Sequence, residues 1–181
     1  MTQTTITIPT LHTDRLTLRA LNASDFGPLC AFYASDRARF VGGPATAEQT
    51  WRILAGEIGH WTLRGYGRFC VVDTETDQMV GLVGPWNPYG WPEAEIGWDL
   101  MNGFEGRGYA TEAAKAARDF AFNTLGWTTA ISLVAIGNDA SARVAQRLGC
   151  IEDAERFIHE RFGETRVFRH PMPQPAEGRP T

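Results

Sequence analysis

The sequence has no long apolar run, no cluster of basic residues and almost no lysine. Lys115 is its only lysine, and the arginines are mixed with acidic residues to give a net charge of −4. Nucleic-acid binding usually needs a basic patch, so we expect no nucleic-acid partner. No stretch is apolar over the length that a membrane span requires, so we expect no membrane partner. The polar N-terminus is also unlike a secretory signal peptide.

Patterns typical of metal sites and disulfide frameworks are missing as well. The three cysteines are widely spaced without a CxxC pair, and the four histidines form neither an HxxxH nor an HExxH pattern. We therefore expect no metal and no disulfide framework, and a cytoplasmic location is the default. For Cys70 and Cys150, packing is a better explanation than a nucleophilic role; the third cysteine is Cys30.

The length and composition suit one folded domain. The chain has 181 residues, of which 43% are hydrophobic, and this is enough for a real core. Residues 1–170 are expected to form that domain. Residues 171–181 contain four prolines and few apolar side chains, so we expect a disordered C-terminal tail.

Hydrophobic periodicity and turn residues predict an α/β (α+β) fold. Helices are expected over residues 24–34, 46–63, 109–124 and 138–148, with Ser24 as one cap and Thr46 with Gln49 as a capping box. Neighbouring hairpins imply antiparallel pairing, whereas the β-α-β unit over residues 93–135 implies one parallel pair. The sheet should therefore be mixed and mostly antiparallel. Strands are expected over residues 15–19, 68–73, 79–86, 93–101, 129–135, 151–158 and 165–169.

Two glycines stand directly before the alanine-rich helix. Gly106 and Gly108 permit backbone angles that other residues avoid. The start of a helix presents unpaired N–H groups and partial positive charge, so it binds phosphate groups well, and Arg107 could add a bidentate contact. The segment fits neither the P-loop nor the GxGxxG pattern. An ordinary glycine turn is an equally good interpretation of the tripeptide alone.

A wider stretch of sequence resembles a known family. The segment AEIGWDLMNGFEGRGYATEAAKAARDFAF, followed by IGNDASARVAQRLGC, resembles the GNAT superfamily of N-acetyltransferases. With the opening LHTDRLTLRALNASDF, it is most similar to the RimJ/RimL-like branch, which includes ribosomal-protein N-terminal acetyltransferases. The resemblance spans roughly residues 11–170. It implies a single-domain GNAT-like fold with six or seven strands, and direct transfer of an acetyl group from acetyl-CoA to an amine.

The resemblance also implies which residues bind acetyl-CoA. The family's pyrophosphate loop, Q/R-x-x-G-x-G/A, corresponds to Glu105-Gly106-Arg107-Gly108-Tyr109-Ala110, followed by Thr111. Glu105 departs from the pattern, but the backbone N–H groups that bind phosphate are unaffected. For Tyr109, a core contact is as good an interpretation as a contact with the cofactor. The preceding strand is expected to diverge from its neighbour and to pair with the pantetheine arm through the backbone of Trp98, Asp99 and Leu100.

Two further positions follow from the family's motif at the next helix. Asn138 matches the asparagine that lies near the cofactor, and Ser141 matches a serine near the thioester. Several relatives use a tyrosine as general acid where this chain has Ala145. Ser141 is then the available hydrogen-bond donor for the leaving sulfur. A capping role for Ser141 is an equally good alternative.

Glu95 is the hypothesis for the general base. It lies on the strand before the glycine loop and shares one face with Gly97 and Asp99, because side chains alternate along a strand. A carboxylate on a central strand facing a cleft could have a raised pKa and accept the proton of an amine. Alternatively, Glu95 only orients the substrate or pairs with an arginine.

The acceptor is expected to be a primary amine on a protein N-terminus or a small molecule. The aromatic loop over residues 86–92 would form part of its pocket, or else a separate hydrophobic cluster. An acidic pocket of Glu93, Glu95 and Asp99 would favour a small-amine or antibiotic acetyltransferase, and an open groove would favour a peptide. A non-catalytic acyl-CoA sensor is the alternative outside the enzymes. A monomer or a homodimer is expected.

Overall fold

The structure, a computed structural model, describes residues 6–160 and 163–172 of the chain. The expected disordered tail falls almost wholly outside these residues. None of the described helices is long and apolar enough to cross a membrane. In chain order the elements are β1 (Leu11–His12), β2 (Leu16–Arg19), η1 (Ala23–Asp25), α1 (Phe26–Tyr33), η2 (Asp36–Phe40), α2 (Ala47–Arg64), β3 (Phe69–Asp73), β4 (Met79–Trp86), β5 (Glu95–Leu100), α3 (Tyr109–Asn123), β6 (Ile131–Ala135), α4 (Asp139–Arg147), β7 (Ile151–His159) and β8 (Gly163–Arg169).

The described strands form one sheet of eight, in the order β1-β2-β3-β4-β5-β6-β8-β7. Neighbouring strands are antiparallel except β5 and β6, which run parallel. The mixed, mostly antiparallel α/β fold expected from the sequence is confirmed. One strand is added to the expected six or seven because Leu11–His12 pairs with β2. A strand of two residues is too short to show an alternating pattern.

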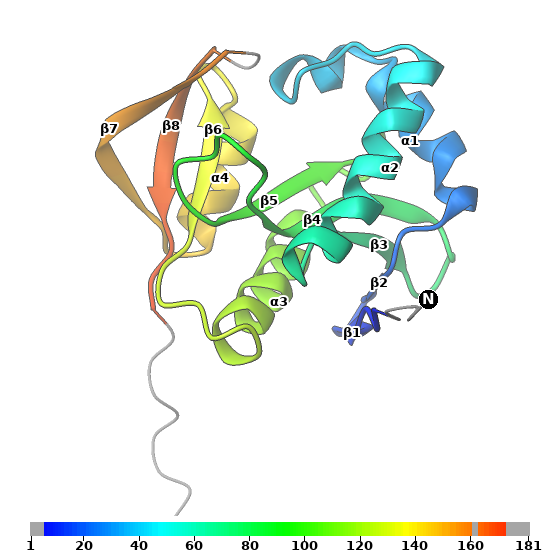
Figure 1. The fold of residues 1–181 in the computed structure, drawn as a ribbon, viewed down its shortest axis with the longest axis horizontal. Coiled ribbons are helices and arrows are strands. Elements are labelled where there is room, and N and C mark those ends of the chain that lie inside the picture. The colour runs from blue at the N-terminus through cyan, green and yellow to red at the C-terminus, as the bar shows by residue number, and fades with distance from the viewer. Residues whose placement is uncertain (1–5, 161–162, 173–181) are drawn as a thin grey trace, which may run out of the picture.

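Helices cover both faces of the sheet (Figure 1). Fully buried alanines of α3 pack against one face, beside Phe69 and Ile96. Because alanine is small, α3 lies close to the sheet, and its first turn shares a cavity with the end of β5. Helices α1 and α2 cover the opposite face, where the alternate residues Cys70 and Val72 of β3 enter a second cluster.

One of the two predicted helix caps is correct. Thr46 Oγ1 accepts a hydrogen bond from Gln49 N–H at 3.2 Å, and Gln49 Oε1 accepts one from Thr46 N–H at 2.8 Å, so the capping box of α2 is confirmed. Ser24 is wrong as a cap. Asn22 caps the 3₁₀ turn η1 and accepts a hydrogen bond from Ser24 N–H at 2.8 Å. Asparagine and serine cap equally well, so the sequence alone does not choose between them.

Strands β5 and β6 separate almost at once. Strand β5 pairs with β4 along its whole length, but its register with β6 consists of Glu95 opposite Ile131. Figure 1 shows β6, β8 and β7 with α4 at one end of the molecule, and β2–β4 with α1 and α2 at the other. Among the described residues, the gap between β5 and β6 therefore leaves one edge of β5 without a strand partner over most of its length.

Candidate active site

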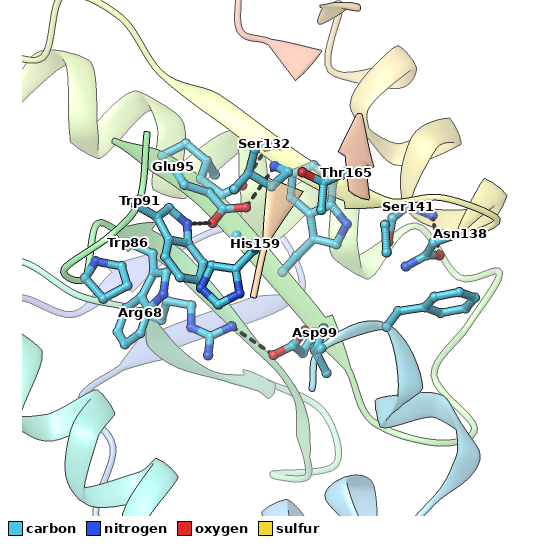
Figure 2. A pocket seen from close by; sticks show the side chains of 18 of the residues that line it. Arg68, Trp86, Trp91, Glu95, Asp99, Ser132, Asn138, Ser141, His159 and Thr165 are labelled. Atoms are coloured by element: carbon cyan, nitrogen blue, oxygen red, sulfur yellow. Dashed lines mark hydrogen bonds and ion pairs between the residues drawn. The ribbon is translucent and has the colours of Figure 1, made fainter. Parts of the chain in front are cut away.

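Glu95 stands where β5 and β6 separate (Figure 2). Its Oε1 accepts a hydrogen bond from Leu133 N–H at 2.9 Å, and its Oε2 accepts one from the Trp91 indole N–H at 2.5 Å. Burial raises the pKa of Glu95, an effect that these hydrogen bonds and the charge of Arg68 oppose. The carboxylate thus accepts a hydrogen bond from β6 that a backbone carbonyl would accept in a continuous sheet. It is also suited to accept a proton.

Ser132 and His170 form a second bridge across the gap. Ser132 Oγ donates a hydrogen bond to the Ile96 carbonyl at 2.7 Å and lies 2.8 Å from His170 Nε2. Burial lowers the pKa of His170 to about 3, so its ring is neutral. Since the Ser132 hydroxyl donates its hydrogen bond to the Ile96 carbonyl, it can only accept one from His170, so the His170 Nε2–H is the donor. The pair ties the strands together and is not arranged for nucleophilic catalysis.

A cavity of about 350 Å³ lies beside Glu95. We term it the aromatic cavity because of the rings in its wall. Trp86, Pro88 and Trp91 of the predicted aromatic loop contribute to it, so this loop is not a separate cluster. Tyr89, by contrast, is 99% exposed. The rings in the wall belong to Tyr33, Phe40, Trp86, Trp91, Trp98 and His159.

Arg68 lies in this wall between two buried carboxylates. Its Nη1 donates to Asp99 Oδ2 at 2.8 Å, and its Nε donates to Glu57 Oε2 at 3.2 Å (Figure 2 shows the Asp99 contact). A second contact joins Nη2 to Glu57 Oε1, and the guanidinium also lies 5.0 Å from the centre of the Trp86 ring. The carboxylate of Asp99 is therefore engaged in an ion pair with Arg68.

The acidic group expected from the sequence differs in one member. Glu93 binds Arg169 at 2.8 Å and does not line the aromatic cavity, whereas Glu57 does. Glu57 and Arg68 were not among the candidates predicted from the sequence. A signal existed for Glu57, because it lies in the buried stripe of α2 between Leu54 and Trp61. A charged residue in such a stripe indicates a buried partner.

The glycine loop borders a second cavity, termed the loop cavity. Gly106 and Gly108 have φ values of 73° and 84°, which other residues adopt only with strain. No side chain caps α3, whose N-cap is Gly108, and the buried hydroxyl of Thr111 has no partner in the described chain. These donors suit an anionic group. The predicted residues that line the loop cavity are Trp98, Asp99, Leu100, Glu105, Gly106, Gly108, Ala110, Thr111, Asn138 and Ser141.

Tyr109 and Arg107 do not line the loop cavity. The Tyr109 hydroxyl donates a hydrogen bond to Asp73, and the Arg15 guanidinium lies 4.7 Å from the centre of its ring. The side chain of Tyr109 is thus a core contact, and only its N–H group faces the helix start. Arg107 is exposed, 5.5 Å from the ring of Phe104.

Glu105, which departs from the family pattern, binds an arginine. Its carboxylate forms an ion pair with Arg37 of η2 and accepts a hydrogen bond from Gly103 N–H at 2.9 Å. Arg37 also donates to the Leu100 carbonyl at 3.2 Å. The loop cavity is therefore basic apart from Glu105 and Asp99; its arginines are Arg37, Arg39, Arg143 and Arg147.

The backbone of β5 offers groups to the gap at alternate residues. The carbonyls of Ala94 and Ile96 both accept hydrogen bonds from β6, at 3.0 and 2.7 Å. Because backbone groups alternate in direction along a strand, Trp98 and Leu100 face the same edge. Asp99 instead turns its backbone toward β4, so the expectation of a backbone contact from Asp99 does not fit this geometry.

Asn138 and Ser141 lie where the two cavities meet. Asn138 Oδ1 accepts a hydrogen bond from Ser141 N–H at 3.2 Å and so caps α4 (Figure 2). The cap is thus Asn138, and the Ser141 hydroxyl has no hydrogen bond within the part of the chain that the structure describes. Ala145 is fully buried in the core. The residues common to both cavities are Phe40, Val41, Trp98, Asp99, Asn138 and Ser141.

Within residues 6–160 and 163–172, no group of three or more His, Cys, Asp or Glu side chains is placed to hold a metal ion.

Comparison with known proteins gives a consistent result. Residues 15–151 match the family described as an acetyltransferase (GNAT) domain. The chain is 29% identical over 157 residues to the uncharacterized N-acetyltransferase p20 of Bacillus licheniformis, a match that covers 81% of this chain and 88% of that protein.

Solved structures with the same fold include two with informative descriptions. The acetyltransferase from Agrobacterium tumefaciens str. C58 is 38% identical, with a TM-score of 0.84 over 95% of this chain and 99% of that chain. The spermidine N-acetyltransferase of Vibrio cholerae, solved with CoA and spermine, is 22% identical, with a TM-score of 0.69 over 87% and 95%. At that identity the second likeness concerns the fold alone.

Proposed function

The chain belongs to the GNAT acetyltransferase family, and on that premise we propose that it moves the acetyl group of acetyl-CoA directly onto a primary amine. One arrangement carries the proposal: the loop cavity and the aromatic cavity meet at the gap between β5 and β6, with Glu95 at its end. The loop cavity would hold the cofactor and the aromatic cavity the amine. The motifs described above also support assignment to the RimJ/RimL-like branch.

The chain offers a separate group for each part of the cofactor. Bound acetyl-CoA supplies an activated acetyl thioester. The uncapped N–H groups of α3 and the arginines of the loop cavity would bind its phosphates. The backbone of Trp98 and the N–H of Leu100 would pair with the amides of the pantetheine arm, since this edge of β5 has no strand partner beyond Glu95 in the described chain. The Leu100 carbonyl already accepts a hydrogen bond from Arg37.

Two side chains would manage the proton and the leaving group. Glu95 would accept one proton from the ammonium group, which frees the nitrogen lone pair. The nitrogen would then bond to the acetyl carbon while the carbon–sulfur bond breaks. The second proton would pass from the nitrogen to the sulfur, which leaves as the CoA thiol, and Ser141 Oγ would donate a hydrogen bond to that sulfur. Holding both reactants at the junction of the cavities can supply a large part of the rate.

Calorimetric titration of acetyl-CoA tests the cofactor site. Gly108→Trp should distort the start of α3 at the loop cavity, because Gly108 has a φ of 84° and an added side chain there would meet Arg15. Gly103→Trp is the matched control, because Gly103 has a similar φ of 87° but does not line the loop cavity. The intact protein and the control should bind with micromolar affinity, about −8 kcal/mol. Gly108→Trp should not bind. Absence of binding by the intact protein would overturn the proposal.

Glu95→Gln tests the reaction. This side chain keeps the shape of glutamate but cannot accept the proton, so kcat should fall by about 10² to 10⁴ with acetyl-CoA affinity unchanged. A non-catalytic acyl-CoA sensor is the second candidate, favoured because both Glu95 oxygens already accept hydrogen bonds. Acetyl-CoA binding without acetylation of any amine would support the sensor and contradict the enzyme.

A further inference from the structure

The walls of the aromatic cavity are held in place before any ligand binds. Trp86 is stacked on His60, with ring centres 4.2 Å apart and planes 23° from parallel, and also contacts the Arg68 guanidinium. Trp91 is fixed by its hydrogen bond to Glu95 and by the His159 ring 4.9 Å away. Three of the protein's six tryptophans line this one cavity. Rigid aromatic walls favour a flat apolar ligand body.

The charges of the cavity favour a cation. Glu57, Asp99 and Glu95 contribute carboxyl groups to the wall, and Arg68 is the one guanidinium that the described residues place there. Arg68 is shared by Glu57 and Asp99, so their pair of negative charges exceeds its single positive charge. Aromatic faces also attract ammonium groups. An amine can therefore enter in its charged form and meet Glu95.

The cavity is small, and elements from both ends of the sheet contribute to its wall. Its wall includes Tyr33 of α1, Phe40 of η2, Leu133 of β6 and Thr165 of β8. A volume of about 350 Å³ lies at the lower end of the range for small-molecule sites. The described residues give it no row of free carboxylates for a second or third ammonium group, since Glu57 and Asp99 are bound to Arg68.

We propose that the acceptor is a compact monoamine whose ammonium group is attached to a flat aromatic body, rather than a polyamine or a peptide N-terminus. The inference rests on the proposed function, because it assigns the aromatic cavity to the amine. Figure 2 shows Trp91 and His159 beside Glu95, so a ring against these side chains would leave its amine near the carboxylate.

A panel of amines tests this substrate class on the intact protein with acetyl-CoA. The panel is 2-phenylethylamine, n-butylamine, spermidine and the peptide Ser-Gly-Gly. Burial of the ring should raise kcat/KM for 2-phenylethylamine at least about tenfold above that for n-butylamine. Spermidine and the peptide should be no better than n-butylamine. A preference for either of them would overturn the inference but leave acetyl transfer established.

Variants of Trp91 separate the aromatic wall from the hydrogen bond to Glu95. The readout is the ratio of kcat/KM for 2-phenylethylamine to that for n-butylamine, in which a shared catalytic defect cancels. Trp91→Phe keeps a flat ring and should preserve the ratio while lowering both rates. Trp91→Leu should lower the ratio about threefold to tenfold. Tyr89→Leu, in the same loop but 99% exposed, is the control and should change neither rate.

Failure of the substrate inference and failure of the proposed acetyl transfer give different results. An unchanged ratio in Trp91→Leu would overturn the inference even if 2-phenylethylamine is a substrate. Acetyl-CoA binding without acetylation of any amine in the panel or of longer peptides would contradict the proposed function itself, and the inference with it.

Discussion

The Glu95 side chain serves two purposes through different lone pairs. Each oxygen accepts one N–H hydrogen bond, from Leu133 or Trp91, and this ties β5 to β6 and to the aromatic loop. A carboxylate has about four acceptor positions, so a proton can still be taken up. The same burial that fixes the side chain raises its pKa and makes it a stronger base.

The pH dependence of kcat/KM should report this carboxylate. Only the ionised form accepts a proton, so activity falls as the pH drops through the pKa of Glu95. Because burial raises that pKa, the acid limb should lie above the ordinary value of about 4.3. Trp91→Phe removes an N–H that lowers the pKa, so the limb should move further up. An acid limb that persists in Glu95→Gln would contradict this assignment.

Glu105 should weaken cofactor binding. It occupies Arg37, which otherwise could bind a phosphate group, and it adds negative charge to the loop cavity. Glu105→Gln should therefore tighten acetyl-CoA binding about twofold to fivefold at low salt, and added salt should reduce the gain. Arg37→Gln should have the opposite effect. Calorimetry at two salt concentrations checks both, and unchanged affinity in Glu105→Gln would show that Arg37 does not reach the cofactor.

At the scale of elements, α3 depends on the size of its buried residues. Ala117 is fully buried against the sheet, so Ala117→Leu should overpack this contact and lower the free energy of unfolding by about 1–3 kcal/mol. Ala55→Leu on the exposed side of α2 is the control and should stay within about 0.5 kcal/mol. Urea unfolding at equal m-values measures the difference. Equal stability of the two variants would mean that α3 is not packed closely against the sheet.

The sequence was sufficient to predict most elements because their signals are local. The stripe of alanines in α3, the capping box of α2 and the alternation in β2 each specify one element without distant contacts. The elements that were missed, β1 and η2, are two and five residues long, which is too short for a periodic pattern of apolar residues to mark them.

The backbone loop of the site could be predicted from the sequence, whereas the contacts between its side chains could not. Gly106 and Gly108 mark a turn that only glycine adopts easily, so the loop could be located from sequence. The partners of Arg68 lie 11 and 31 residues away, on α2 and β5. No sequence spacing brings such residues together, because the fold sets their distance. The turning of Tyr109 toward Asp73 has the same cause.

At the scale of the molecule, Arg68 joins α2 to β5 through buried ion pairs. The Arg68 side chain is 12% exposed, and those of Glu57 and Asp99 are 2% and 3% exposed. Arg68→Met would leave both carboxylates buried without a partner, which should cost about 3–5 kcal/mol of unfolding free energy. Urea unfolding measures this loss.

Two further variants make that test specific. Arg52→Met breaks an exposed pair with Glu48 on α2 and should cost at most about 1 kcal/mol. Adding Glu57→Gln to Arg68→Met should recover part of the lost unfolding free energy, because it removes one of the two buried carboxylates left without a partner. If Arg68→Met is no more costly than Arg52→Met, water must reach the buried pair.

The separation of β5 and β6 has a consequence for how the protein opens. Residues 11–100 supply β1–β5, and residues 131–169 supply β6, β8, β7 and α4, so each side is continuous in sequence. Within the described chain, the seam between the two strands holds one register pair, reinforced by the bonds of Glu95 and Ser132. We expect two foldons, with amide protons of β6–β8 exchanging as a group at lower free energy than those of β3 and β4. Acetyl-CoA lying along the seam would make the two foldons exchange as one cooperative unit.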